Sequence, residues 1–252
     1  MSSLHDLIDS LTRRPGPVLT SYSHERVELG GAVAARWLAK IANLLGEELS
    51  VDLFSGAEMP PGRILLNLDY WQRVVWEISA LGMGWTVLPA APSPAAPSSV
   101  DCLGPADVLV THKDGPQARE ALAHGAHVLL QPRDFLAFGW GQTLPAGALD
   151  ALAELMAQPD ALITRIPDPA PALNDAVSKS LEGNAALAHA TIGSGARVGL
   201  IADSRQVGAQ VLDQWLAGHS VVLIDPTLYN DGQAEQILVD ERADGGWVVY
   251  RW

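Results

Sequence analysis

The segment RILLNLDYWQRVVWEISALGMGWTVL, residues 63–88, decides the fold. Its first six residues are mostly apolar, as in a strand that is buried on both faces of a parallel sheet. Asp69 can cap the following helix, and Gly82 can end it before a short strand at residues 85–88. The apolar face of that helix comprises Trp71, Val74, Val75, Ile78 and Leu81. The segment therefore predicts a βαβ unit.

The same alternation of helices and strands extends to both ends of the chain. An amphipathic helix is predicted at residues 4–11, capped by Ser2 or Ser3 and ended by Pro15. Further strands are predicted at residues 24–29, 107–111, 127–131, 160–166, 197–202, 220–224 and 247–250, and further helices at residues 33–45, 117–124, 146–157, 174–189 and 207–216. This order predicts an α/β fold with mostly parallel sheets and helices on both faces.

Two proline-rich stretches interrupt this pattern. Residues 89–99 contain four prolines and no charge, so a long surface loop is predicted there. A second cluster, with three prolines at residues 167–171, separates a predicted strand from the next helix. We therefore expect two α/β subdomains, residues 1–166 and residues 167–252, which could also form one compact unit.

The composition of the chain indicates which kinds of binding partner and which cellular compartment to expect. Of the 252 residues 48% are hydrophobic, and 29 acidic and 16 basic side chains give a formal net charge of −13. This acidic excess argues against nucleic acid or an anionic membrane as a partner. The single cysteine is Cys102, the N-terminus lacks the pattern of a signal peptide, and no apolar run reaches ~18 residues. These features predict a cytoplasmic protein.

Motifs that would mark a catalytic, cofactor or metal site are weak or absent in the sequence. No GxxxxGK[ST] phosphate loop and no GxSxG nucleophile elbow occur, and Gly-Ser-Gly at residues 193–195 precedes a predicted strand instead of following one. His124 and His127 have a spacing that metal ligands can use, but Gly125 ends the helix between them. The sequence therefore predicts no catalytic residue, no cofactor and no metal.

Acidic and hydroxyl side chains directly follow two of the predicted strands. Asp203 and Ser204 come after residues 197–202, and Asp225 comes after residues 220–224. In doubly wound sheets, side chains at the carboxyl ends of strands bind ligands, so these three residues are the ligand-binding candidates. The alternative is that Asp203 or Ser204 caps the helix that follows.

Five segments in succession resemble a known family. They are ELGGAVAARWLAKIANLL (28–45), ILLNLDYW (64–71), MGWTVLPA (83–90), ADVLVT (106–111) and LAGHSVVLID (216–225). Their order resembles the N-terminal part of the adenylate-forming ligases, the AMP-binding family that includes the acyl-CoA synthetases. The resemblance implies the fold of the N-terminal domain of acyl-CoA synthetases. It extends to shortened relatives in actinobacteria, and the excess of arginine over lysine agrees with such a source.

The sequence departs from the family where the resemblance places ATP. Family members bind the ATP phosphates with a loop of the form TSGTTGxPKG, which follows the strand that corresponds to residues 160–164. Here that place reads RIPDPAPALN, residues 165–174, without glycine or lysine. Prolines carry no N–H donor and Asp168 repels phosphate, so a cradle of amides is not expected. Lys179 restores one cation but not the loop.

Two functions from different classes follow from these observations. The family's adenine loop, magnesium-binding acidic motif and mobile C-terminal domain have no counterpart in the sequence, so the leading hypothesis is a non-catalytic binding or regulatory protein. The alternative is a nucleotide- or acyl-dependent enzyme, such as a ligase completed by a partner chain, in which Asp203 and Asp225 act. The expected partners are a second copy or another protein, together with a small-molecule ligand that the sequence does not identify.

Overall fold

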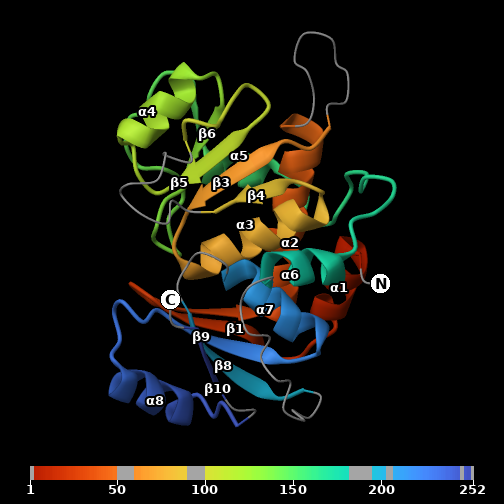
Figure 1. Ribbon diagram of the computed structural model, residues 1–252, viewed down its shortest axis with the longest axis vertical. Helices are drawn as coiled ribbons and strands as arrows, with labels where there is room; N and C mark the ends of the chain where they lie inside the picture. Colours follow the sequence, from red (N-terminus) through yellow and green to blue (C-terminus); the bar gives the residue numbers. More distant parts are fainter. Residues whose placement is uncertain are drawn as a thin grey trace. The chain divides into compact units, whose positions relative to one another are not determined.

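A computed structural model describes residues 3–49, 60–89, 100–181, 195–202, 207–244 and 247–250 of the chain (Figure 1). The chain forms two compact units, each discontinuous in sequence. Unit 1 comprises Met1–Ala35, Asp69–Ile78 and Ala172–Trp252, and unit 2 comprises Arg36–Leu68 and Ser79–Pro171. The chain passes from one unit to the other four times, and the boundary expected at residue 167 lies near the last of these points, between Pro171 and Ala172. The proline-rich stretches do not indicate the three earlier points.

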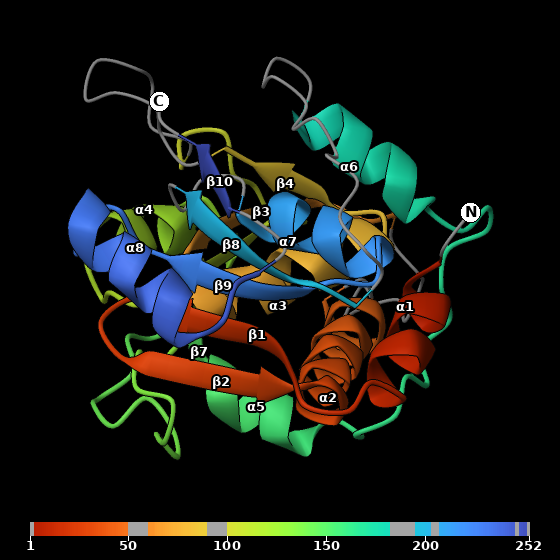
Figure 2. The same cartoon turned by 90° about the horizontal axis from the view of Figure 1, so that it is seen from below.

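Unit 1 contains a five-stranded sheet with the strand order β10-β8-β9-β1-β2, and Figure 2 shows these strands side by side. They are β1 (Pro17–Tyr22), β2 (Arg26–Gly30), β8 (Arg197–Ala202), β9 (Ser220–Ile224) and β10 (Trp247–Tyr250). β1 and β2 form an antiparallel hairpin, and all other neighbours are parallel. The sequence pattern predicts β2 but not β1, because Thr20 and Ser21 interrupt the apolar run of β1 although both are buried.

Helices of unit 1 begin at or near the predicted residues. α1 (Leu4–Thr12) starts with a capping box, in which Ser3 Oγ accepts the N–H of Asp6 at 3.2 Å and Asp6 Oδ2 accepts the N–H of Ser3 at 2.9 Å. α7 (Val207–Leu216) is confirmed. α6 (Leu173–Leu181) covers the first part of the helix predicted at residues 174–189, and the rest of that prediction lies outside the described residues. None of the helices in the described ranges is long and apolar enough to cross a membrane.

One helix of unit 1, α8 (Asp231–Asp240), has no counterpart in the sequence prediction. Its buried residues are Ala234 and Leu238, a stripe too narrow for an amphipathic pattern to be recognised. Directly after this helix, Glu241 accepts hydrogen bonds from three side chains, those of Tyr22, Arg26 and Arg197. Burial raises the pKa of the Glu241 carboxyl, but these hydrogen bonds outweigh it and hold the pKa below its usual value.

Unit 2 contains a second five-stranded sheet, with the order β4-β3-β5-β6-β7 and only parallel neighbours. Its strands are β3 (Arg63–Asn67), β4 (Thr86–Leu88), β5 (Val108–Thr111), β6 (His127–Leu130) and β7 (Ala148–Asp150). Helices α2 (Gly31–Asn43) and α3 (Tyr70–Gly82) contribute residues to both units, whereas α4 (Pro116–Ala123) and α5 (Ala151–Ala157) belong to unit 2. The βαβ unit predicted from residues 63–88 is confirmed as β3-α3-β4.

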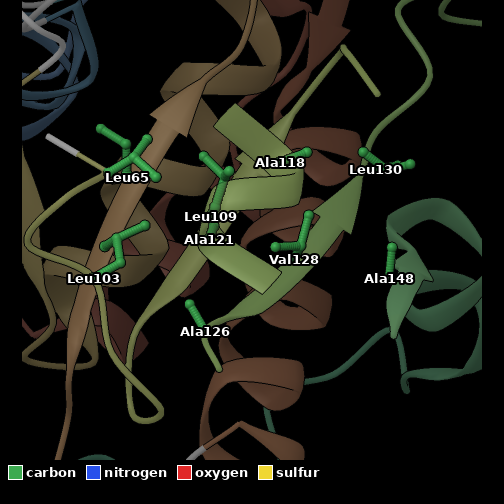
Figure 3. Packing of buried hydrophobic residues seen from close by; sticks show 10 residues of the cluster. Leu65, Leu103, Leu109, Ala118, Ala121, Ala126, Val128, Leu130 and Ala148 are labelled. Atoms are coloured by element: carbon green, nitrogen blue, oxygen red, sulfur yellow. The ribbon is translucent and has the colours of Figure 1, made fainter. Parts of the chain in front are cut away.

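One face of the unit 2 sheet packs against α4. Figure 3 shows Ala118 and Ala121 of this helix with the apolar side chains of the central strands. The cluster comprises Leu65, Val100, Leu103, Leu109, Ala118, Ala121, Ala126, Val128, Leu130 and Ala148. Alanines on the helix let its backbone approach the larger leucine and valine side chains of the sheet closely, and Leu122 of α4 packs against the same cluster.

Two predictions about residues 146–166 are wrong. The helix predicted at residues 146–157 begins at Ala151, because residues 148–150 pair with β6 as an edge strand. Residues 160–166 form no strand, although their composition predicts one. The backbone hydrogen bonds that a neighbouring strand would supply are made instead by a single buried side chain, that of Asn43 at the end of α2.

Asn43 binds four backbone groups of this irregular segment. Its Nδ2 donates to the carbonyls of Pro159 and Ala161 at 3.3 and 2.9 Å. Its Oδ1 accepts the N–H groups of Ile163 and Thr164 at 2.9 and 3.1 Å. Asn43 itself is fully buried, the bond to Thr164 is buried and the other three are partly buried, and together the four bonds fix the path of residues 159–164.

The residues around Asn43 fit the same segment. After α2 the chain continues as a π-helix, η1 (Leu44–Glu48), and a Cβ atom at Gly46 would lie 2.1 Å from Thr164 Oγ1. Only glycine therefore allows the π-helix to approach this closely. One turn earlier, Lys40 donates to the carbonyl of Gln158 and pairs with Asp160 at 2.9 Å.

The Asn43→Ala variant is expected to lose about 2–4 kcal/mol of unfolding free energy, because two carbonyl and two N–H groups in buried or partly buried positions lose their partner. Asn174→Ala is the control, since Asn174 is exposed in the first turn of α6 and its loss should change stability by no more than about 0.5 kcal/mol. Urea unfolding measures both. Equal effects of the two substitutions would contradict the role assigned to Asn43.

Candidate functional site

Each sheet has one place where a ligand is expected. In open parallel sheets, ligands bind at the carboxyl ends of two adjacent strands whose connections leave in opposite directions. In unit 1 these strands are β8, which leads to β9, and β9, which leads back across β8 to β10. In unit 2 they are β3, which leads to β4, and β5, which leads the other way to β6.

The unit 1 position is the one that the sequence predicts. Of the residues predicted there, the structure describes only Asp225, whose carboxylate forms hydrogen bonds within the protein. Asp203 and Ser204 lie outside the described residues. Asp225 is buried, and its Oδ1 accepts the N–H and the hydroxyl of Thr227 at 2.8 and 2.7 Å. These bonds close a turn after β9, so Asp225 orders the connection to α8. Its ligand-binding role stays a prediction.

The helix that follows β8 has its first amides occupied by a buried carboxylate. Glu77 of α3 accepts the N–H of Ala209 at 3.0 Å and also that of Gly208, both in the first turn of α7. Arg73 Nε lies 3.2 Å from Glu77 Oε2, and both side chains are nearly inaccessible. Burial raises the pKa of the Glu77 carboxyl, against the opposing effect of Arg73 and the amides. An internal group thus fills this anion position.

The fit between Glu77 and α7 predicts opposite effects for two glycine-to-alanine substitutions. A Cβ atom at Gly208 would lie 2.5 Å from Glu77 Cβ, so Gly208→Ala should destabilise the protein by about 2 kcal/mol despite the better helix propensity of alanine. The nearest atom to a Cβ at Gly232, in α8, is 3.7 Å away. Gly232→Ala should therefore stabilise by up to about 1 kcal/mol, and thermal unfolding that moves both variants in the same direction would contradict this packing.

The unit 2 position presents uncharged polar side chains. Asn67 ends β3, and its Nδ2 donates to Gln117 Oε1 in α4 at 3.0 Å. Thr111, which is buried, ends β5, and its carbonyl accepts the N–H of Gln131 at 2.9 Å. His112 Nδ1 lies 2.8 Å from the carbonyl oxygen of Gln131. Amides, a hydroxyl and an imidazole therefore meet at the carboxyl edge of β3, β5 and β6.

Two buried polar atoms at this edge have no hydrogen-bond partner in the described part of the chain. They are Oε1 of Gln131, whose residue is 2% exposed, and Nε1 of Trp140. Unpartnered buried polar atoms also occur in unit 1, on Ser21, Arg197 and Gln210. Buried polar groups are rarely left without partners, so each of these atoms is a position for ordered water or a ligand group.

Two carboxylates of unit 2 bind groups of the protein, whereas the exposed charged residues Lys113, Asp114, Arg133 and Asp134 follow β5 and β6 at the carboxyl edge. Asp107 precedes β5, where it binds Arg63 and accepts the N–H of Gly104 at 2.8 Å. Burial raises the pKa of the Asp107 carboxyl, but these hydrogen bonds outweigh it and lower the pKa. At the carboxyl edge, Asp150 accepts three N–H groups, those of Leu152, Ala153 and Trp140. Its role is to cap α5 and to hold the preceding loop.

The sequence also places polar residues at the strand ends of unit 2, but the prediction from the sequence favoured the acidic and hydroxyl residues at the strand ends of unit 1. Asn67, Thr111 and Gln131 directly follow or end strands, as Asp203 and Asp225 do in unit 1. What the sequence does not show is which polar atoms find partners within the protein. Groups of three or more His, Cys, Asp or Glu side chains suited to a metal ion are not found among the described residues.

The segment where the family places the ATP phosphates contains no strand and no glycine. Residues 165–171 are irregular and lead into α6, whose first turn contains Asp175 and whose last turn contains Lys179. Asp168 is exposed before that helix. One carboxylate, that of Asp175, therefore lies in the first turn of α6, and Lys179 lies in the last turn.

Comparison with known proteins confirms the expected fold. No protein-family model and no curated protein sequence matches the chain. Solved structures, in contrast, are similar to it. Acetoacetyl-CoA synthetase from Streptomyces lividans is 17% identical, with a TM-score of 0.55 over 87% of this chain and 38% of that chain. Amide bond synthetase McbA from Marinactinospora thermotolerans is 14% identical, with a TM-score of 0.58 over 95% of this chain and 47% of that chain, and a long-chain-fatty-acid-CoA ligase, FadD1, from Archaeoglobus fulgidus is 12% identical, with a TM-score of 0.58 over 96% of this chain and 50% of that chain.

These similarities define the architecture. The fold is that of the N-terminal part of the adenylate-forming ligases, and the chain spans half or less of the length of these three proteins. At such low identity, likeness transfers the fold and not the chemistry.

Proposed function

We propose that this protein is a non-catalytic binding protein on the fold of the N-terminal part of adenylate-forming ligases. The observation that carries the proposal is the chemistry of residues 165–175. They contain three prolines without N–H groups, no glycine, one cation at Arg165 and two carboxylates at Asp168 and Asp175. A triphosphate needs several converging amides and positive charge, and this segment offers few donors and net negative charge.

The preceding residues support the same proposal. A phosphate loop is held rigid by the strand it leaves, but residues 160–166 form no strand and follow the side chain of Asn43. The backbone N–H groups of Ile163 and Thr164 are directed at Asn43 Oδ1, so they are engaged within the protein. Residues 159–164 are therefore held along an irregular path, and the following segment does not begin from the strand that a phosphate loop needs.

The binding role is placed at the carboxyl edge of β3, β5 and β6 in unit 2. That edge combines a topological switch point with polar atoms that the described residues leave open. The acidic composition fits a cytoplasmic protein that acts on a small molecule or on another protein, including a second copy, and not on nucleic acid.

Purified protein is expected to show no acid-dependent exchange of labelled pyrophosphate into ATP with magnesium and a panel of carboxylic acids. The reason is that no triphosphate binds at residues 165–175. An acyl-CoA synthetase assayed with its own acid is the positive control. Exchange above the level without acid would overturn the proposal and favour the alternative, an enzyme completed by a partner chain.

A further inference from the structure

The connection between β6 and β7, residues 131–147, presents two large apolar side chains to solvent. It has neither helix nor strand, and connections of this length within a compact unit are usually functional. Phe138 is 100% exposed and Leu136 is 80% exposed. Two such side chains, so fully exposed and only two residues apart on one loop, mark a contact surface.

Contacts with the folded unit fix the path of this loop. The N–H of Trp140 donates to Asp150 Oδ2 at 2.7 Å, and a Cβ atom at Gly139 would lie 2.8 Å from the same oxygen. Trp140 also packs against the core cluster that Figure 3 shows. Leu136 and Phe138 are therefore held on an ordered loop, which lowers the entropic cost of binding a partner there.

The same loop is uncharged in a strongly acidic chain. Residues 135–149 contain no charged side chain, whereas the whole chain has a formal net charge of −13. Two copies of such a chain repel each other at long range, and this repulsion is least where a surface carries no net charge. The loop is therefore a surface on which two acidic molecules can meet.

Charged residues of both signs border the apolar side chains. Arg133 and Asp134 precede them, and the carbonyl of Asp134 accepts the N–H of Ala137 at 3.2 Å, which closes a turn. Lys113 and Asp114 lie at the same edge, because they follow β5, which pairs with β6. These two cations and two anions cancel, so a strongly basic partner gains nothing here. An apolar centre with a polar rim is the arrangement found in protein interfaces.

We infer, on the basis of the binding role proposed above, that the partner at this edge is a second copy of the chain, bound about a twofold axis through residues 132–144. Leu136 and Phe138 of each copy bury against the same loop of the other copy, and the four charged residues form the rim. A twofold interface uses one surface twice, so that surface must be complementary to itself. An apolar centre and a rim with equal numbers of cations and anions meet this condition.

Sedimentation at two salt concentrations tests the partner. At about 200 µM the chain should be mainly dimeric in about 500 mM NaCl, and its dissociation constant should be at least about threefold higher in about 50 mM NaCl. The reason is that salt screens the repulsion between two acidic copies. A monomer at both concentrations would overturn the inference, whatever other protein then binds the loop. A dimer that does not tighten with salt would also overturn it.

Matched surface variants test the location of the interface. Phe138→Ser and Leu136→Ser should each raise the dissociation constant of the dimer at least about tenfold, because each change is present on both sides of the axis. The melting temperature of the dilute protein should not change, since both side chains are exposed. Val239→Ser is the control, because Val239 in α8 is 62% exposed beside charged residues and should not affect dimerisation.

Unchanged dimerisation in both loop variants, or an equal effect of Val239→Ser, would overturn the assignment of the interface to this loop. Hydrogen exchange adds a readout on the unmodified protein, since amides of residues 132–144 should become more protected as its concentration rises. Pyrophosphate exchange reports separately: its presence would refute the non-catalytic role without altering sedimentation, and a monomer would overturn the interface without restoring catalysis.

Discussion

The four hydrogen bonds of Asn43 are the constraint on which the functional reading of this fold depends. They hold residues 159–164 along an irregular path at the end of α2, supported by the glycine contact between η1 and Thr164. A strand leading into a glycine-rich turn would satisfy its backbone through neighbouring strands and leave the next amides open to phosphate. In this protein the side chain of Asn43 binds the backbone of residues 159–164 instead, and the residues that follow, 165–175, include three prolines and two carboxylates.

Local patterns predict most of the fold. The βαβ unit at residues 63–88, the cap of α1 by Ser3 and the strands β8 and β9 follow directly from apolar runs and capping residues. The wrong predictions involve tertiary partners. Residues 160–166 have a strand-like composition, but hydrogen bonds to Asn43, which is distant in sequence, determine their path. β7 is an edge strand of only three residues, and the alanines in and around it favour a helix prediction. The discontinuous units cannot be predicted from local composition, because two of their boundaries fall inside the regular helices α2 and α3.

The candidate site was less predictable than the fold. The sequence shows which polar residues follow strands, and this led to the prediction of Asp203, Ser204 and Asp225 as ligand-binding residues. Whether each polar atom already has a hydrogen-bond partner within the protein depends on the folded structure. Asp225 closes a turn with Thr227, and Glu77 occupies the first amides of α7 from another helix. Buried polar atoms without a hydrogen-bond partner occur among the described residues of both units, on Ser21 and Gln210 in unit 1 and on Gln131 and Trp140 in unit 2. Which polar groups are satisfied within the protein is therefore visible only in the folded structure.

The most direct measurement of the central claim is a crystal structure of the protein grown with millimolar ATP and magnesium. The account predicts that residues 159–164 keep their hydrogen bonds to Asn43 and that no triphosphate lies along residues 165–175. A triphosphate seated there, with main-chain N–H groups directed at its oxygens, would contradict the account.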